Sequence, residues 1–145
     1  MDLCQAMLAR VRPTSVVTLM LADAKALPFP DRSFDAVFAY HVFGHGLARE
    51  RKAMAKEAAR VLGPGGKLFV KVFSDNDLRA GQGTTLETST YQRGEGIITH
   101  YFSKKEANAL FKGLTPISSK EIKWKQRVEG KYLERAEFEL LLEKI

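Results

Sequence analysis

Hydrophobic and polar positions along the chain follow patterns of strands and of one amphipathic helix. Apolar runs of strand length occupy 15–21 and 34–40, and a further strand is expected at 67–73. The run at 34–40 is nearly continuous, which is typical of a parallel strand buried on both faces, so we expect it to be central in a sheet. The segment between the second and third of these strands, residues 47–62, has apolar residues at helical spacing. Its opposite face is charged, with Arg49, Lys52, Lys56 and Arg60. This order predicts a parallel strand, helix, strand unit.

The two ends of the chain and the middle add smaller elements. A short helix is expected at the start, because Leu3, Met7, Leu8 and Val11 recur at helical spacing before Pro13. Residues 74–96 show no period and predict a long loop, which is either a lid or binding element or else disordered. A capping box at Ser103 and Glu106 begins another helix, and 116–128 with 133–142 predict an antiparallel hairpin. The 145 residues therefore predict a single α/β domain with a C-terminal hairpin.

Composition excludes several classes of protein. With 45% hydrophobic and 28% charged residues, the chain has an ordinary globular balance. Cys4 is the only cysteine, which excludes a disulfide framework. No apolar run approaches the roughly 18 residues of a membrane span, and the first residues do not resemble a secretory signal. We therefore expect a cytoplasmic protein without a membrane partner.

The net charge of +6 raises the question of nucleic-acid binding. The densest basic cluster lies in the expected hairpin, where Lys123, Lys125 and Arg127 alternate with Trp124, Gln126 and Val128. Such an alternation gives a strand one cationic face. We interpret it as a solvated strand face or an edge strand guarded by lysines, with an RNA-facing surface as the less favoured alternative.

Candidate site residues follow the expected parallel strands. In open parallel sheets, ligands bind beyond the carboxyl ends of the strands. The residues at those positions are Asp23 after the first run, His41 after the second and Asp75 after the third.

These positions carry a family resemblance. The run from Asp23 through LPFPDRSFD, a strand, a histidine-containing turn and RVLGPGGKL resembles class I S-adenosylmethionine-dependent methyltransferases, including the ubiquinone-biosynthesis group. The resemblance covers about residues 2–73. It implies a Rossmann-like sheet and S-adenosylmethionine as the cofactor. It also implies that Asp23 accepts a hydrogen bond from the adenine amino group, that Ala24 and Leu27 wall the adenine, and that Tyr40 and His41 lie beside the methionine end.

The first residues resemble a second part of that cofactor site. Asp2 and Leu3 open a segment similar to the end of the family's second strand, where an acidic residue holds the ribose hydroxyls. Asp2 followed by Gln5 is equally a helix cap that needs no ligand. Asp23 likewise has a simpler explanation, as a turn residue that binds its own backbone. His41 and His45 are spaced to share a helix face, but no third ligand stands at motif spacing, so no metal site is expected.

Methyl transfer by direct displacement asks a protein mainly for alignment and exclusion of water. If the acceptor is a hydroxyl, a general base helps, and His45 and His100 are the candidates at neutral pH. For His45, packing at the helix entrance is the favoured alternative to a place in the pocket wall. We expect a small-molecule acceptor. The alternatives are a non-catalytic interaction module and an RNA-binding or RNA-modifying domain.

A glycine-rich loop after a first strand, which the family uses to hold the cofactor, is absent from the 145 residues. We therefore interpret the chain as an N-terminally truncated methyltransferase domain. Without the preceding strands, 34–40 is expected to expose one backbone edge and an apolar face. We also expect the isolated chain to bind the cofactor weakly or not at all, unless a complementing chain or a second copy completes the open edge.

Overall fold

The computed structural model describes residues 5–10, 12 and 16–145. Three helices and seven strands are formed there. In chain order they are α1 (Gln5–Leu8), β1 (Phe34–Tyr40), α2 (Ala48–Val61), β2 (Leu62–Phe73), β3 (Thr84–Glu87), β4 (Thr90–Arg93), β5 (Ile97–His100), α3 (Lys104–Leu110), β6 (Thr115–Val128) and β7 (Lys131–Glu143). α1 confirms a short helix near the start, although Leu3 lies outside the described residues.

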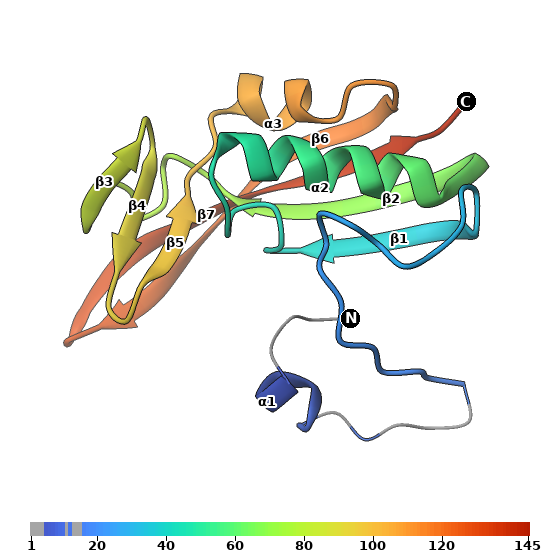
Figure 1. Ribbon diagram of the computed structural model, residues 1–145. Coiled ribbons are helices and arrows are strands. Elements are labelled where there is room, and N and C mark those ends of the chain that lie inside the picture. The colour runs from blue at the N-terminus through green and yellow to red at the C-terminus, as the bar shows by residue number, and fades with distance from the viewer. Residues whose placement is uncertain (1–4, 11, 13–15) are drawn as a thin grey trace.

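The main sheet has four strands in the order β1, β2, β7, β6. β1 runs parallel to β2, whereas β7 is antiparallel to both β2 and β6. Figure 1 shows α2 and α3 together on one side of this sheet. The arrangement confirms the expected α/β fold, with a parallel strand, helix, strand unit followed by an antiparallel hairpin.

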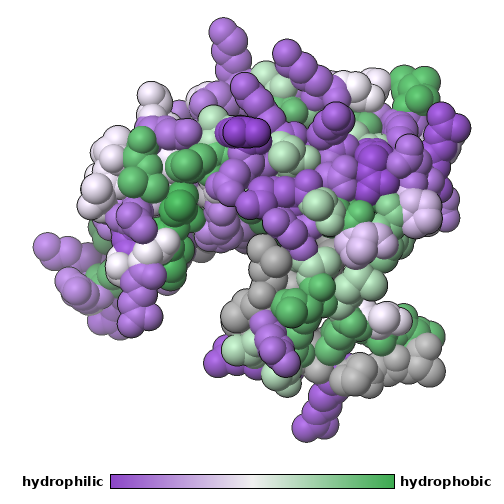
Figure 2. Space-filling model, in the orientation of Figure 1, coloured by the Kyte–Doolittle hydropathy of each residue, from purple (hydrophilic) through white to green (hydrophobic). Residues whose placement is uncertain are grey.

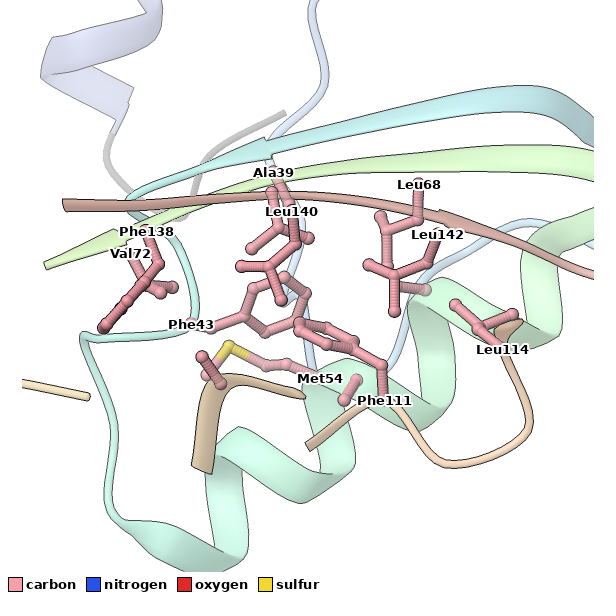
Figure 3. Close-up of a cluster of buried hydrophobic side chains, with 14 of the residues drawn as sticks. Ala39, Phe43, Met54, Leu68, Val72, Phe111, Leu114, Phe138, Leu140 and Leu142 are labelled. Atoms are coloured by element: carbon pink, nitrogen blue, oxygen red, sulfur yellow. The ribbon is translucent and has the colours of Figure 1, made fainter. Parts of the chain in front are cut away.

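The core fills the space between the main sheet and its two helices (Figure 3). Leu68, Val70 and Val72 alternate along β2 toward this side and are at most 1% exposed. The rings of Phe43 and Phe111 meet edge to face, with their centroids 4.9 Å apart. Burial of each such side chain contributes about 1.5–3 kcal/mol, so this cluster holds the helices on the sheet.

α2 confirms the helix expected at 47–62. Met54, Ala55 and Ala58 are buried, and Figure 2 shows a mostly hydrophilic surface over the outer side of the helix. The carboxylate of Glu50 caps the start of α2 by accepting a hydrogen bond from the Leu47 amide at 2.9 Å. No helix within the described ranges is long and apolar enough to cross a membrane.

The long loop expected at 74–96 is wrong in its second half. β3, β4 and β5 form a separate three-stranded antiparallel sheet. The β4–β5 turn uses glycines with positive φ, at Gly94 (53°) and Gly96 (93°), a backbone conformation that glycine adopts without steric cost. Strands of four residues are too short for an alternating pattern to stand out, which is why the sequence favoured a loop.

The strand expected at 15–21 is also wrong for the part that is described. Residues 16–21 contain no strand, and Val16 is 89% exposed. A strand is stable only when a neighbour accepts and donates its backbone hydrogen bonds. Val17 and Leu21 form only isolated bridges, and neither described sheet includes a strand from this segment.

β1 occupies an edge of the sheet, not the centre, because among the described residues it pairs only with β2. Ala39 points into the core at 7% exposure, whereas Phe38 and Tyr40 on the opposite face are 61% and 49% exposed. The expected exposure of one edge and an apolar face is therefore confirmed. The expectation of burial on both faces is wrong for this chain.

β6 forms the other edge of the sheet, since it pairs only with β7 in the part of the chain that is described. Lys123, Lys125 and Arg127 are exposed there, and Lys123 pairs with Glu134 of the neighbouring strand at 3.0 Å. This position confirms the interpretation of a lysine-guarded edge strand.

Candidate functional site

The site lies beyond the carboxyl ends of β1 and β2, at a rim that we define by Tyr40, His41 and Phe73. The chain leaves β1 at His41, whose amide donates to the Lys71 carbonyl at 2.8 Å. His41 then takes a left-handed conformation, with φ of 57°. Such a value is uncommon for a side chain with a Cβ, and the β2 neighbour holds it in place.

The ring of His41 is fixed from two sides. It stacks on Phe73 with a centroid distance of 4.3 Å, and its Nε2 lies 3.1 Å from Oε2 of Glu137 on β7. Burial lowers the pKa of His41, although the Glu137 carboxylate opposes this shift. The ring is therefore mostly neutral at pH 7, donates through Nε2 and leaves Nδ1 as an acceptor. That Nδ1 is buried without a hydrogen-bond partner.

Asp23 lies near the start of α2. Its Oδ1 accepts the Lys25 amide at 2.8 Å, which is the turn geometry that the simpler explanation required. Lys25 then pairs with Glu50, in the first turn of α2, at 2.8 Å. Because only residues 42–47 separate His41 from the start of α2, Asp23 and His41 lie at the same end of the unit.

The other residues predicted to bind the cofactor lie at different distances from Asp23. Ala24 packs against the core beside Asp23. The Leu27 amide donates to Glu57 at 2.8 Å, seven residues beyond Glu50 on α2, or about 10 Å farther along the helix axis. Leu27 therefore lies farther from the rim than Asp23. Asp2 and Leu3 lie outside the described residues.

Tyr40 faces the uncovered side of the sheet, where Lys71 Nζ lies 5.5 Å from its ring centroid. The two side chains border a shallow hollow of about 210 Å³, whose floor includes Phe69 and Leu141. Glu139 and Lys120 close the hollow with an ion pair of 3.3 Å. Tyr40 thus joins the rim to an amphipathic depression on the open face.

His45 is exposed in the loop between β1 and α2. Its Nδ1 lies 2.8 Å from the carbonyl oxygen of Ile98 on β5. A carbonyl can only accept, so Nδ1 carries the proton and Nε2 keeps its lone pair free. This tautomer is the one that a general base at Nε2 requires.

His100 is held differently, with only 1% exposure. Its Nδ1 lies 2.8 Å from Thr90 Oγ1, and its Nε2 is 3.8 Å from Glu106. Burial, followed by the charge of Arg51, lowers the pKa of His100 to about 4. A neutral, enclosed ring of this kind favours a structural role for His100 and leaves His45 as the better-placed base.

Sequence reasoning missed Glu137, Arg135 and Phe73 as neighbours of the site. They meet His41 because β7 pairs with β2 in a register that sets Phe73 opposite Glu137. Arg135 lies over the Phe73 ring at 5.1 Å and pairs with Asp77 at 2.6 Å. The sequence of β7 gave no signal for Arg135 and Glu137, because charged residues recur along the strand.

Comparison with known proteins addresses the family directly. A family model described as a methyltransferase domain matches residues 1–70. The 27-O-demethylrifamycin SV methyltransferase of Amycolatopsis mediterranei is 32% identical over 146 aligned positions, which cover 87% of this chain and 51% of that protein. The resemblance to the class I S-adenosylmethionine-dependent methyltransferases is therefore confirmed. S-Adenosylmethionine is the cofactor of this family, as the resemblance implied.

Further members of the methyltransferase family agree with this assignment. The ubiquinone/menaquinone biosynthesis C-methyltransferase of Chromobacterium violaceum is 51% identical over 59 residues, 41% of this chain and 23% of that protein. A solved S-adenosylmethionine-dependent methyltransferase from Methanosarcina mazei superimposes with a TM-score of 0.68 at 23% identity, covering 86% of this chain and 65% of that one. The chain thus spans between about a quarter and about half the length of these two curated relatives.

Proposed function

We propose that this chain takes part in methyl transfer from S-adenosylmethionine to a small organic acceptor, with the cofactor held at the rim by Asp23, Ala24, Tyr40 and His41. The observation that carries the proposal is the convergence of Asp23 and His41 at one end of the β1, α2, β2 unit. This is where an open parallel sheet binds its ligand.

The polar groups at the rim suit the two ends of the cofactor. Asp23 is only partly engaged by Lys25 and keeps 40% side-chain exposure, so its carboxylate can accept a hydrogen bond from an adenine amino group. The unpartnered Nδ1 of His41 is an acceptor that fits an ammonium donor such as the amino group of the methionine moiety. A buried acceptor without a partner costs about 1–3 kcal/mol, so a bound donor there stabilises the site.

The proposed chemistry is direct displacement. S-Adenosylmethionine supplies an electrophilic methyl group when bound. The residues of the chain align the acceptor and exclude water. The cofactor would leave as S-adenosylhomocysteine when its methyl–sulfur bond breaks. For a hydroxyl acceptor, His45 Nε2 would take the hydroxyl proton, and the ring is held for this by its contact with Ile98.

The test measures cofactor-product binding by NMR, because no glycine-rich loop is present in the 145 residues and we expect weak affinity. S-Adenosylhomocysteine is titrated into ¹⁵N-labelled protein. Chemical-shift changes at the amides of Ala24 and His41 are expected, and Asp23→Ala is expected to weaken binding about tenfold, the loss of one charge-assisted hydrogen bond. Asp35→Ala, an exposed aspartate at the start of β1 and so at the opposite end of that strand from the rim, serves as the matched control. If saturating ligand shifts no rim amide, or if both variants bind equally, the proposal is wrong.

A further inference from the structure

Three arginines gather around the buried Tyr101, next to the rim. They are Arg79 in the segment after β2, Arg93 at the end of β4 and Arg135 on β7. Tyr101 is 1% exposed, and burial raises its pKa. The charges of Arg93, Arg79 and Arg135 act against that shift, while Asp77 supports it. All three guanidinium groups therefore lie within electrostatic reach of one phenol.

Only one of these arginines is neutralised. Arg135 donates to Asp77 at 2.6 Å and to Gln126 at 2.8 Å. Arg79 and Arg93 form no ion pair with any residue that the structure describes, and Arg93 Nε is buried without a hydrogen-bond partner. Both side chains are half-buried, so their charge stays accessible, while the buried Nε–H of Arg93 lacks an acceptor. A carboxylate or phosphate satisfies such a donor with charge-assisted hydrogen bonds.

The backbone holds Arg93 in this position. Gly83 has φ of 108°, and a Cβ built on it falls 2.4 Å from the Gln92 carbonyl oxygen and 2.5 Å from Arg93 Cγ. Only glycine allows the segment after β2 to lie against the stem of Arg93 so closely. The same segment is fixed by Asp77, whose Oδ1 accepts the Arg79 amide at 3.0 Å. The two unpaired arginines thus come from segments that pack directly on each other.

The cluster lies one aromatic ring from the proposed methyl-transfer site. Phe73 stacks on His41 at 4.3 Å, carries Arg135 at 5.1 Å and lies 6.2 Å from the Tyr101 ring centroid. A molecule of the size of one substituted ring can therefore reach both the rim and the arginines. We propose that Arg79 and Arg93 bind the anionic group of the methyl acceptor, which is a small organic carboxylate or phosphate. This inference rests on the proposed methyl-transfer function and names its substrate class.

The test uses simple aromatic probes and needs no cofactor. Benzoate, phenyl phosphate and the neutral benzamide are titrated separately into the protein, and binding is followed through the Arg Nε–H and backbone amide signals. We expect both anions to shift the Arg93 Nε–H signal and benzamide to leave it unchanged. Arg93→Gln is expected to weaken anion binding about tenfold. Arg127→Gln, which removes the same charge at the exposed tip of the hairpin, is expected to have no effect.

The outcomes separate this inference from the proposed function. A stronger response to benzoate than to phenyl phosphate assigns the site to carboxylates, and the reverse assigns it to phosphates. Equal binding of benzamide, or equal loss in Arg93→Gln and Arg127→Gln, overturns the inference. S-Adenosylhomocysteine is titrated into the same samples. If it still shifts the rim amides while the anions do not bind, the acceptor class is wrong and the methyl-transfer proposal stands.

Discussion

The ring of His100 couples folding to pH. Its pKa falls from the ordinary 6.5 to about 4 because of burial, so the unfolded chain binds a proton that the folded chain excludes between these values. Above pH 6.5 the ring is neutral in both the folded and the unfolded state, and its full contribution to the free energy of unfolding is present. As the pH falls from about 6.5 to about 4 we expect a loss of at most about 3 kcal/mol of unfolding free energy from this residue, and no further loss below that.

Urea denaturation at pH 7, 5.5 and 4 checks this expectation. Carboxylates also titrate in the range, so the informative quantity is the difference between wild type and His100→Gln, a variant that keeps a polar side chain near Thr90. We expect the variant to be less stable at pH 7 and the gap to narrow toward pH 4. His45→Gln, at an exposed ring, controls for the loss of a histidine. A gap that does not change with pH refutes the assignment.

Among the elements, the two open edges of the main sheet differ in protection. β6 carries Lys123 and Lys125, whose charges oppose strand pairing with another molecule, whereas β1 presents exposed aromatics. We expect Lys123→Ile combined with Lys125→Ile to increase self-association, measured as mass by light scattering over a concentration series. The double variant Lys105→Ile, Lys112→Ile removes two exposed lysines near α3 and is the control. Equal association of the two variants contradicts an edge-specific role.

The elements also show what the sequence could predict. α2, the capping box at Ser103 and the β6–β7 hairpin were predictable because their signals are local, in periodicity, caps and turns. The Ser103 box is formed in the structure, with Ser103 and Glu106 bonding each other's backbone. Residues 16–21 did not form the expected strand because pairing depends on a neighbour. β3, β4 and β5 were missed because each is only four residues long.

Some residues of the candidate site could likewise be predicted from the sequence, and others could not. The position of His41 could be predicted from its place after an apolar run, because β1 is a parallel strand of the sheet. Asp23 follows a run that forms no strand, and its position depends on the contacts of Lys25 with Asp23 and Glu50. Glu137 and Arg93 could not be identified, since their closeness to the rim depends on the β2–β7 register and on the packing at Gly83. The burial of His100 was likewise a tertiary effect. Position along a strand is readable from sequence, whereas the neighbours across the sheet are not.

At the scale of the whole molecule, the small sheet of β3, β4 and β5 is joined to the body by a few polar contacts around the start of α2. Glu87 Oε2 accepts the Ala48 amide at 2.9 Å and lies 3.6 Å from Arg51. His100 donates its amide to the Gly44 carbonyl at 2.8 Å. Because Arg93 belongs to this sheet, the same contacts set the distance between the arginine cluster and the rim.

Glu87→Ala tests this coupling. Loss of the carboxylate leaves the Ala48 amide uncapped and the buried Arg51 without its ion pair, at a cost of about 1–3 kcal/mol. This free energy is lost from the contacts between the small sheet and the start of α2. We therefore expect faster hydrogen exchange in β4 and β5, with unchanged protection in the centre of β2. Glu95→Ala, in the exposed β4–β5 turn, is expected to leave both regions unchanged. If Glu87→Ala loses protection uniformly, the two sheets unfold as one unit. If its hydrogen-exchange rates equal those of the wild type, Glu87 does not join the two sheets.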